Sequence, residues 1–209
     1  MSVIHQLSSV LGKSGNEGEI ALANQIVMTE NHHDVAELVQ NLANKNKGVR
    51  SDCIKTLYEI GYRAPELIAE YHENFLQLLM DKNNRMIWGA MVALAIIAEL
   101  KSAELFGSLD LILNTMAQGS VITLDGGMEI LAKLNKFEAF TATINPILLK
   151  KLRQCPIKQL PQYLEKSLVS VNPGNREAFL ALIDTRLNEC ERESQRKRLK
   201  KIIRAMNEK

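Results

Sequence analysis

The 209-residue sequence contains few aromatic residues for a chain with so many apolar positions. Phe, Trp and Tyr make up 5% of the residues, whereas hydrophobic residues as a whole make up 46%. Most apolar positions therefore hold aliphatic residues such as Leu, Ala and Met. Unbranched aliphatic side chains lose little rotamer freedom in a helix, so this composition favours helix over strand. We predict an all-α fold with few or no strands.

Cysteine is also scarce, and its spacing carries no motif. Cys53, Cys155 and Cys190 lie far apart and form no CxxC pair. An odd number of distant cysteines indicates neither a disulfide framework nor a thiolate metal site. The first residues lack both a positive stretch and a long apolar core, so they do not resemble a signal peptide. We expect a protein of the reducing cytoplasm.

The sequence lacks an apolar run long enough to cross a membrane. Its most apolar uncharged run is the thirteen residues from Met86 to Ala98, which lie between Arg85 and Glu99. A spanning helix needs about 20 predominantly apolar residues. We therefore predict no membrane span and no membrane partner.

What the sequence does contain is a repeat. Four segments share one apolar register when the chain is shifted against itself by 37 residues, and a second apolar segment precedes each of them at the same period. Within each segment the apolar residues follow the i, i+3, i+4, i+7 spacing of a helix. The repeating unit is therefore a pair of helices. The apolar pairs that define the register are Leu57 and Ile60, Leu94 and Ile97, Leu131 and Leu134, and Leu168 and Val171.

Polar turns separate the predicted helices. "NKNKGVR" (44–50) and "DKNNRMI" (81–87) occupy equivalent places, where the turn chemistry favours the start of a new helix. Pro65 and Pro173 lie where one helix is expected to end before another begins. Asn145 followed by Pro146 predicts an N-cap and the first residue of a helix.

This pattern resembles the HEAT family of helical repeats, to which armadillo repeats are closely related. The match is strongest in "LLMDKNNRMIWGAMVALAIIA" (78–98) and the register extends from about residue 33 to residue 171. The third unit departs from it with "ITLDGG", and the fourth places Pro161 near the start of its second helix. The resemblance implies a right-handed superhelix, or solenoid, of antiparallel helix pairs and a role as a protein-binding scaffold.

The predicted domain organisation follows from the repeat. Residues 1–209 form a single helical-repeat domain, with capping helices in 1–30, four HEAT-like repeats in 31–171 and a C-terminal repeat or cap in 172–209. Terminal repeats are commonly atypical because one of their faces meets water.

The last helix carries a strong excess of positive charge. Residues 191–209 contain eight Lys or Arg and three Glu, whereas residues 1–190 have a net charge of −3. We favour a solvated cap, since Lys and Arg suit a helix C-terminus. An acidic partner, a nucleic acid or a membrane surface is the other interpretation. This basic patch consists of Arg196, Lys197, Arg198, Lys200, Lys201 and Arg204.

The sequence shows no catalytic constellation. No nucleophile is paired with a base, and His32, His33 and Asp34 lie at a predicted helix start, where polar residues are ordinary. We therefore predict a protein that is not an enzyme and that holds no cofactor and no metal.

The expected function is the binding of a protein or peptide on the inner face, formed by the second helices. The residues expected to read the partner leave the apolar register of those helices; they are Lys55, Glu59, Trp88, Val92, Ile96, Asp125, Glu129 and Lys133. The pattern leaves open whether Trp88, Val92 and Ile96 are exposed or covered by neighbouring units.

The alternative is a nucleic-acid binder similar to the HEAT-repeat DNA glycosylases. Trp88 and Asp125 occupy equivalent places one period apart, as an aromatic and an acidic residue of such a site would. The net negative charge of the first 190 residues disfavours this alternative, because neutralisation of phosphates supplies most non-specific affinity.

Overall fold

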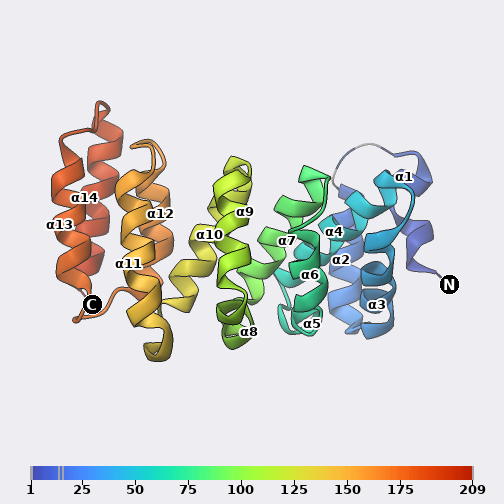
Figure 1. Cartoon of the computed structure of the whole chain (residues 1–209). Coiled ribbons are helices and arrows are strands. Elements are labelled where there is room, and N and C mark those ends of the chain that lie inside the picture. The colour runs from blue at the N-terminus through green and yellow to red at the C-terminus, as the bar shows by residue number, and fades with distance from the viewer. Residues whose placement is uncertain (1, 14, 16, 209) are drawn as a thin grey trace. The chain divides into compact units, whose positions relative to one another are not determined.

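The computed structural model describes residues 2–13, 15 and 17–208, and these residues form helices and no strands. The all-α prediction is confirmed. The chain divides into two compact units, Met1–Gly127 and Met128–Lys209, which we call the N-terminal unit and the C-terminal unit and describe separately (Figure 1). That residues 1–209 act as a single domain stays a prediction.

The N-terminal unit contains short 3₁₀ helices and a series of α-helices, of which α10 extends across the boundary. Asn46 and Asn83 cap α4 and α7 by accepting hydrogen bonds from backbone N–H groups, as the polar turns predicted. The elements are η1 (Val3–Gln6), α1 (Ser8–Leu11), α2 (Glu17–Thr29), α3 (His32–Gln40), η2 (Asn41–Ala43), α4 (Lys47–Gly61), α5 (Glu66–Ala69), α6 (His72–Leu78), α7 (Asn84–Ile97), α8 (Ser102–Gly107), α9 (Leu109–Gln118) and α10 (Val121–Leu134).

Two layers of helices make up the N-terminal unit. In one layer α4 packs between α2 and α7, and the other layer contributes α3 against α4, and α5 and α6 against α7. α4, α7 and α10 begin at residues 47, 84 and 121, so their starts are 37 residues apart. The register residues Leu57, Ile60, Leu94 and Ile97 are fully buried in the core.

The C-terminal unit contains α11 (Glu138–Gln154), α12 (Leu160–Ser167), η3 (Leu168–Ser170), α13 (Arg176–Leu187) and α14 (Glu193–Asn207). α11 packs against α12 and α13, and α14 packs against α12 and α13. Tyr163 and Phe179 fill the core of this unit and are fully buried. Leu168 lies in η3 and is only half-buried, so the apolar register weakens in the fourth repeat.

One local prediction is wrong. Pro146 does not open a helix, because α11 begins at Glu138 and contains Pro146 in its interior. A proline there removes one backbone hydrogen bond of the helix. The fully buried side chains of Ile144 and Leu148, on either side of Pro146, hold the helix continuous through this position.

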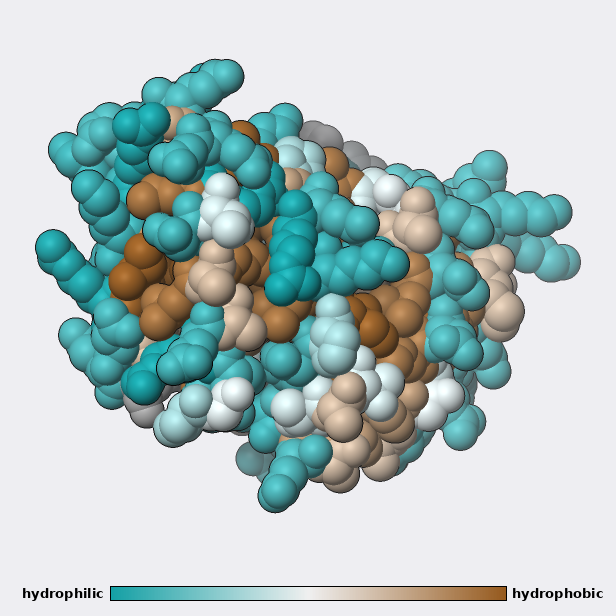
Figure 2. Space-filling model, turned by 60° about the vertical axis from the view of Figure 1, so that its left-hand side comes forward, coloured by the Kyte–Doolittle hydropathy of each residue, from teal (hydrophilic) through white to brown (hydrophobic). Residues whose placement is uncertain are grey.

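Hydrophilic side chains cover most of the face seen in Figure 2, and apolar side chains show between them. Within the described residues, every helix is too short or too polar to span a membrane.

Candidate functional site

Three aromatic side chains form a row, which we call the aromatic row: Tyr62, directly after α4, Tyr58 of α4 and Trp88 of α7. The rings of Tyr62 and Tyr58 have centroids 6.1 Å apart and meet edge to face, at 73°. The Tyr58 and Trp88 centroids are also 6.1 Å apart, at 45°. Both pairs lie within the range in which aromatic rings attract each other.

Two cations lie over this row. The guanidinium carbon of Arg85 is 5.7 Å from the centroid of Trp88, and Nζ of Lys55 is 5.6 Å from that of Tyr58. Cations at this distance are attracted by the negative face of the ring. The row therefore belongs to an ordered array that joins the end of α4 to the first turns of α7.

The accessible part of the row is its two ends. Tyr62 follows α4 directly and is 61% exposed, and Trp88 is half-buried, whereas Tyr58 between them is 8% exposed. Burial, and then the neighbouring Glu59 carboxylate, raise the pKa of Tyr58 to about 12. Its phenol is therefore neutral at physiological pH.

Lys55 corrects the sequence analysis, because it is not exposed. It is 7% exposed and lies 3.6 Å from the carboxylate of Glu59. The same carboxylate pairs with Arg63 at 3.0 Å. Because α4 packs against several helices, a position outside the narrow apolar register is still covered.

Val92 and Ile96 follow Trp88 at intervals of four residues along α7, and both are half-buried. Ile96 packs towards α4 at Gly61, where an added Cβ would come within 3.2 Å of the Ile96 side chain. The sequence left open whether Trp88, Val92 and Ile96 are exposed or covered, and in the structure all three are half-buried. The neighbouring helix covers one side of this stripe and leaves the other accessible.

The three predicted residues of α10 are also half-buried, with Asp125 in the N-terminal unit and Glu129 and Lys133 in the C-terminal unit. Glu129 forms ion pairs with Lys133, at 3.0 Å, and with Lys166 of α12. Burial alone would raise the pKa of Glu129, but the hydrogen bond and charge of Lys166, together with Lys133, lower it below the usual value. Glu129 thus offsets one of the two positive charges beside it.

Sequence reasoning missed Tyr58, Tyr62, Arg85 and Lys166. A signal existed for Lys166, which lies one period of 37 residues after Glu129. Tyr58 and Tyr62 are four residues apart, which places them on one face of the helix end. The contact of Tyr58 with Trp88 joins two helices, and the residue pattern of a single helix does not reveal it.

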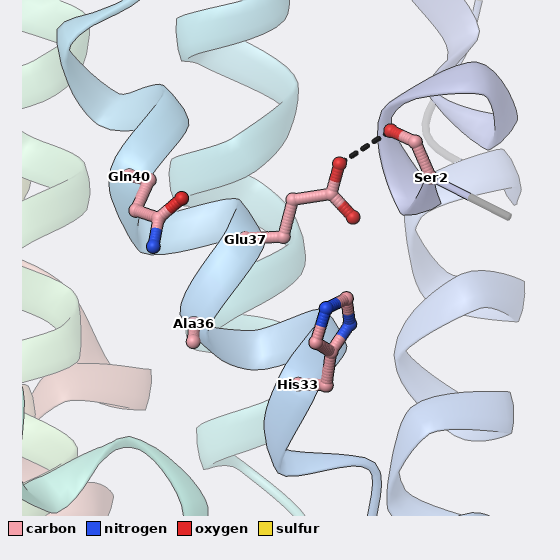
Figure 3. Close-up of a pocket in the computed structure, with 5 residues that line it drawn as sticks. All are labelled: Ser2, His33, Ala36, Glu37 and Gln40. Carbon is pink, nitrogen blue, oxygen red and sulfur yellow. Dashed lines mark hydrogen bonds between the residues drawn. The ribbon is translucent and has the colours of Figure 1, made fainter.

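A pocket of about 420 Å³ lies beside α3 and is lined by Ser2, His33, Ala36, Glu37 and Gln40. Figure 3 shows Glu37 reaching from α3 towards Ser2. One carboxylate oxygen of Glu37 accepts a hydrogen bond from the Ser2 hydroxyl, and the other accepts one from the backbone N–H of Val3, at 2.9 Å. Burial would raise the pKa of Glu37, but these two donors hold it below its usual value.

The same helix places His33, Asp34 and Glu37 so that their donor atoms lie within 4.8 Å of one another. Such a group could in principle hold a cation. Both oxygens of Glu37 already accept hydrogen bonds from the Ser2 and Val3 segment. These hydrogen bonds attach the Ser2 and Val3 segment to α3, and this role accounts for the position of Glu37.

All six residues of the basic patch on α14 are exposed. Arg198 pairs with Glu165 of α12, with Nε 2.6 Å from the carboxylate. Arg196 donates a hydrogen bond to the carbonyl oxygen of Cys190, at 2.9 Å. The patch thus contains two arginines that are hydrogen-bonded to other residues of the C-terminal unit, Arg196 and Arg198, beside cations that face solvent.

No family model and no curated protein matches the chain. Among solved structures, an engineered protein matches 100% of this chain and 98% of its own, with a TM-score of 0.65 and 16% identity. A designed armadillo repeat protein in complex with the peptide (KR)4 matches 98% of this chain and 91% of its own, with a TM-score of 0.65 and 17% identity.

Computationally designed armadillo repeat proteins for modular peptide recognition give a TM-score of 0.62 and 17% identity, over 97% of this chain and 90% of theirs. At such identities the likeness concerns the fold. The chain therefore has the armadillo-like helical-repeat fold, as its resemblance to HEAT and armadillo repeats implied.

Proposed function

We propose that the N-terminal unit binds a peptide segment of a partner protein along α4 and α7, with the aromatic row as its anchor. The observation that carries this proposal is the row itself. Tyr62 and Trp88 leave part of their rings accessible, next to the half-buried stripe of Val92 and Ile96. Aromatic side chains are enriched among the residues that dominate binding energy, and apolar neighbours that exclude water surround them.

The arrangement of the second helices supports a peptide as the partner. α4 and α7 lie side by side, and their equal repeat spacing presents similar positions at regular intervals. A chain lying across such a surface meets one helix after another. The designed armadillo protein in complex with (KR)4 binds its peptide on the same fold.

Charge favours a peptide that carries basic side chains. The N-terminal unit contains nine Lys or Arg and fifteen Asp or Glu, a net charge of −6. Near the row, Lys55 and Arg63 are both paired with Glu59, and Arg85 lies over Trp88, so the attraction comes from the unit as a whole. A unit of this charge attracts cationic segments over long range and raises their rate of association.

We infer a binding role without catalysis. The aromatic row consists of three rings, with two cations over it. The phenol of Tyr58, whose pKa is raised to about 12, is a poor nucleophile at neutral pH. Peptide recognition also agrees with the cytoplasmic location that we expect from the cysteine content.

The test is a selection of peptides from a random displayed library on the intact protein, followed by titration calorimetry of the enriched peptides. We expect basic peptides, and we expect Tyr62→Ala to weaken them about tenfold or more, the loss of at least 1.4 kcal/mol that is typical of an anchor. Trp88→Ala should weaken them further.

Tyr71→Ala is the matched control, because it removes the same side chain next to α6, in the other helix layer. Circular dichroism of each variant shows that it remains folded. The proposal fails if no peptide is enriched. It also fails if the enriched peptides bind Tyr62→Ala and Trp88→Ala as tightly as the original protein.

A further inference from the structure

The net charge differs strongly between the two units, and the difference extends beyond the basic residues of 191–209. The C-terminal unit contains seventeen Lys or Arg and nine Asp or Glu, a net charge of +8. The N-terminal unit has a net charge of −6. The excess of negative charge in residues 1–190 therefore comes from the N-terminal unit. It gives no argument against binding of a polyanion by the C-terminal unit.

Helix α14 has two faces of different kinds. Leu199, Ile202 and Met206 are buried, and α14 packs against α12 and α13. On the opposite face Lys197, Lys200 and Arg204 are exposed. Their spacings of three and four residues place them in one narrow sector of the helix, and the first and last are about 10 Å apart along its axis.

We call these three cations the cationic row. Arg198 pairs with Glu165, and the charge of Lys201 helps Arg198 to lower the pKa of that same carboxylate. Among the residues that the structure describes, no ion pair involves a member of the cationic row. The acidic residues nearest to the row in the sequence are Glu193, at the start of α14, and Glu208, directly after its end.

We propose that the cationic row binds the phosphate backbone of double-stranded nucleic acid, a function beyond the peptide binding proposed above. Fixed positive charges on one helix face are the electrostatic footprint of nucleic-acid binding. Helix α14 contains no aromatic residue, which disfavours a single strand held by base stacking.

The burial of the apolar face decides against the other anionic partners. A helix that binds a membrane surface inserts its apolar side chains among the lipids, whereas those of α14 are covered by its own unit. A protein interface centres on apolar or aromatic anchors and is poor in lysine. The cationic row offers charge alone, which suits a regular array of phosphates.

The test is filter binding of the full protein to a labelled duplex of about 20 base pairs of mixed sequence, at sodium chloride concentrations from about 50 to 200 mM. With three phosphates neutralised, the logarithm of the association constant should fall with that of salt with a slope of about −2.7, or about 40-fold over this range. The triple variant K197Q/K200Q/R204Q should lose most of the affinity and most of the slope.

Two controls match this variant. K150Q/R153Q/K158Q removes the same three charges from exposed positions on and after α11 of the same unit and should keep most of the affinity. R198Q removes a cation that Glu165 already neutralises and should change the slope little.

The inference is wrong if the duplex does not bind at the lowest salt, or if the two triple variants weaken it equally, since net charge alone would then explain binding. It is also wrong if polyglutamate, or vesicles containing one third phosphatidylserine, bind more tightly than the duplex and lose this binding in K197Q/K200Q/R204Q. The peptide-binding test concerns α4 and α7, so its outcome is independent of the outcome of the duplex-binding test.

Discussion

At the scale of single residues, Arg186 connects three parts of the C-terminal unit. Its guanidinium group donates hydrogen bonds to the carbonyl oxygens of Leu152, at 2.9 Å, and Cys155, at 2.8 Å. It also pairs with Glu189 at 2.7 Å. The last carbonyls of a helix lack partners within that helix. A residue of α13 therefore completes the hydrogen bonding at the end of α11.

We expect Arg186→Met to lower the free energy of unfolding by about 2–4 kcal/mol, because it removes the charged donor of two buried carbonyls and leaves Leu152 only the weaker Cys155 thiol. Arg192→Met, at an exposed position before α14, should cost well under about 1 kcal/mol. Urea denaturation followed by circular dichroism measures both. Equal losses in the two variants would contradict the role assigned to Arg186.

The residue scale also shows where sequence reasoning succeeds. Leu57 and Ile60 belong to the predicted apolar register and are fully buried. Cys53, one turn before Leu57, is fully buried as well, and burial raises its pKa to about 12. Lys55 and Tyr58 could not be placed in the same way. Their surroundings depend on how several helices pack against α4, which a periodicity within one helix does not contain.

At the scale of elements, the starts of helices are well predicted because they depend on local chemistry. Asn46 and Asn83 cap α4 and α7 through their own side chains, and the neighbouring residues suffice to recognise them. Pro146 misled the prediction, because a proline that suits the first turn of a helix is tolerated inside α11, where buried neighbours hold the helix. The outcome there depends on packing rather than on local chemistry.

The contact between α7 and α10 depends on a glycine. A Cβ at Gly126 would lie 2.9 Å from Cγ and 3.1 Å from the backbone oxygen of Met91. We expect Gly126→Ala to destabilise the protein by about 1–3 kcal/mol, as overpacking does, although alanine favours helix. At Gly107, the last residue of α8, an added Cβ would have no neighbouring atom within 4 Å. Gly107→Ala should therefore be neutral or stabilising by up to about 1 kcal/mol.

Thermal unfolding of the two glycine variants beside the original protein checks this prediction. A melting temperature for Gly126→Ala equal to or above that of Gly107→Ala would show that α10 can move away from α7 at no cost, contrary to the close approach of the two backbones.

At the scale of the whole molecule, the main feature is the segregation of charge. A net charge of −6 in one unit and +8 in the other leaves only +2 overall, and the isoelectric point is about 8.4. Net charge governs solubility and non-specific binding rather than fold. Each unit contains charges of both signs, but the excess is negative in one unit and positive in the other.

We therefore expect the protein at pH 8.4, where its net charge is close to zero, to be retained at low salt by both cation-exchange and anion-exchange resins. K197Q/K200Q/R204Q should elute earlier from the cation exchanger and keep its retention on the anion exchanger. Passage of the original protein through both columns without retention would contradict the segregation of charge.

The position of the single tryptophan has a practical consequence. Trp88 lies in the N-terminal unit, and the C-terminal unit contains Tyr163 as its only tyrosine. Tryptophan emission excited near 295 nm therefore reports on one unit alone, whereas the far-ultraviolet ellipticity reports on the helices of both. The chain thus contains its own spectroscopic reporter. The separation between the two melting curves of the unmodified protein measures how tightly the stabilities of the two units are coupled.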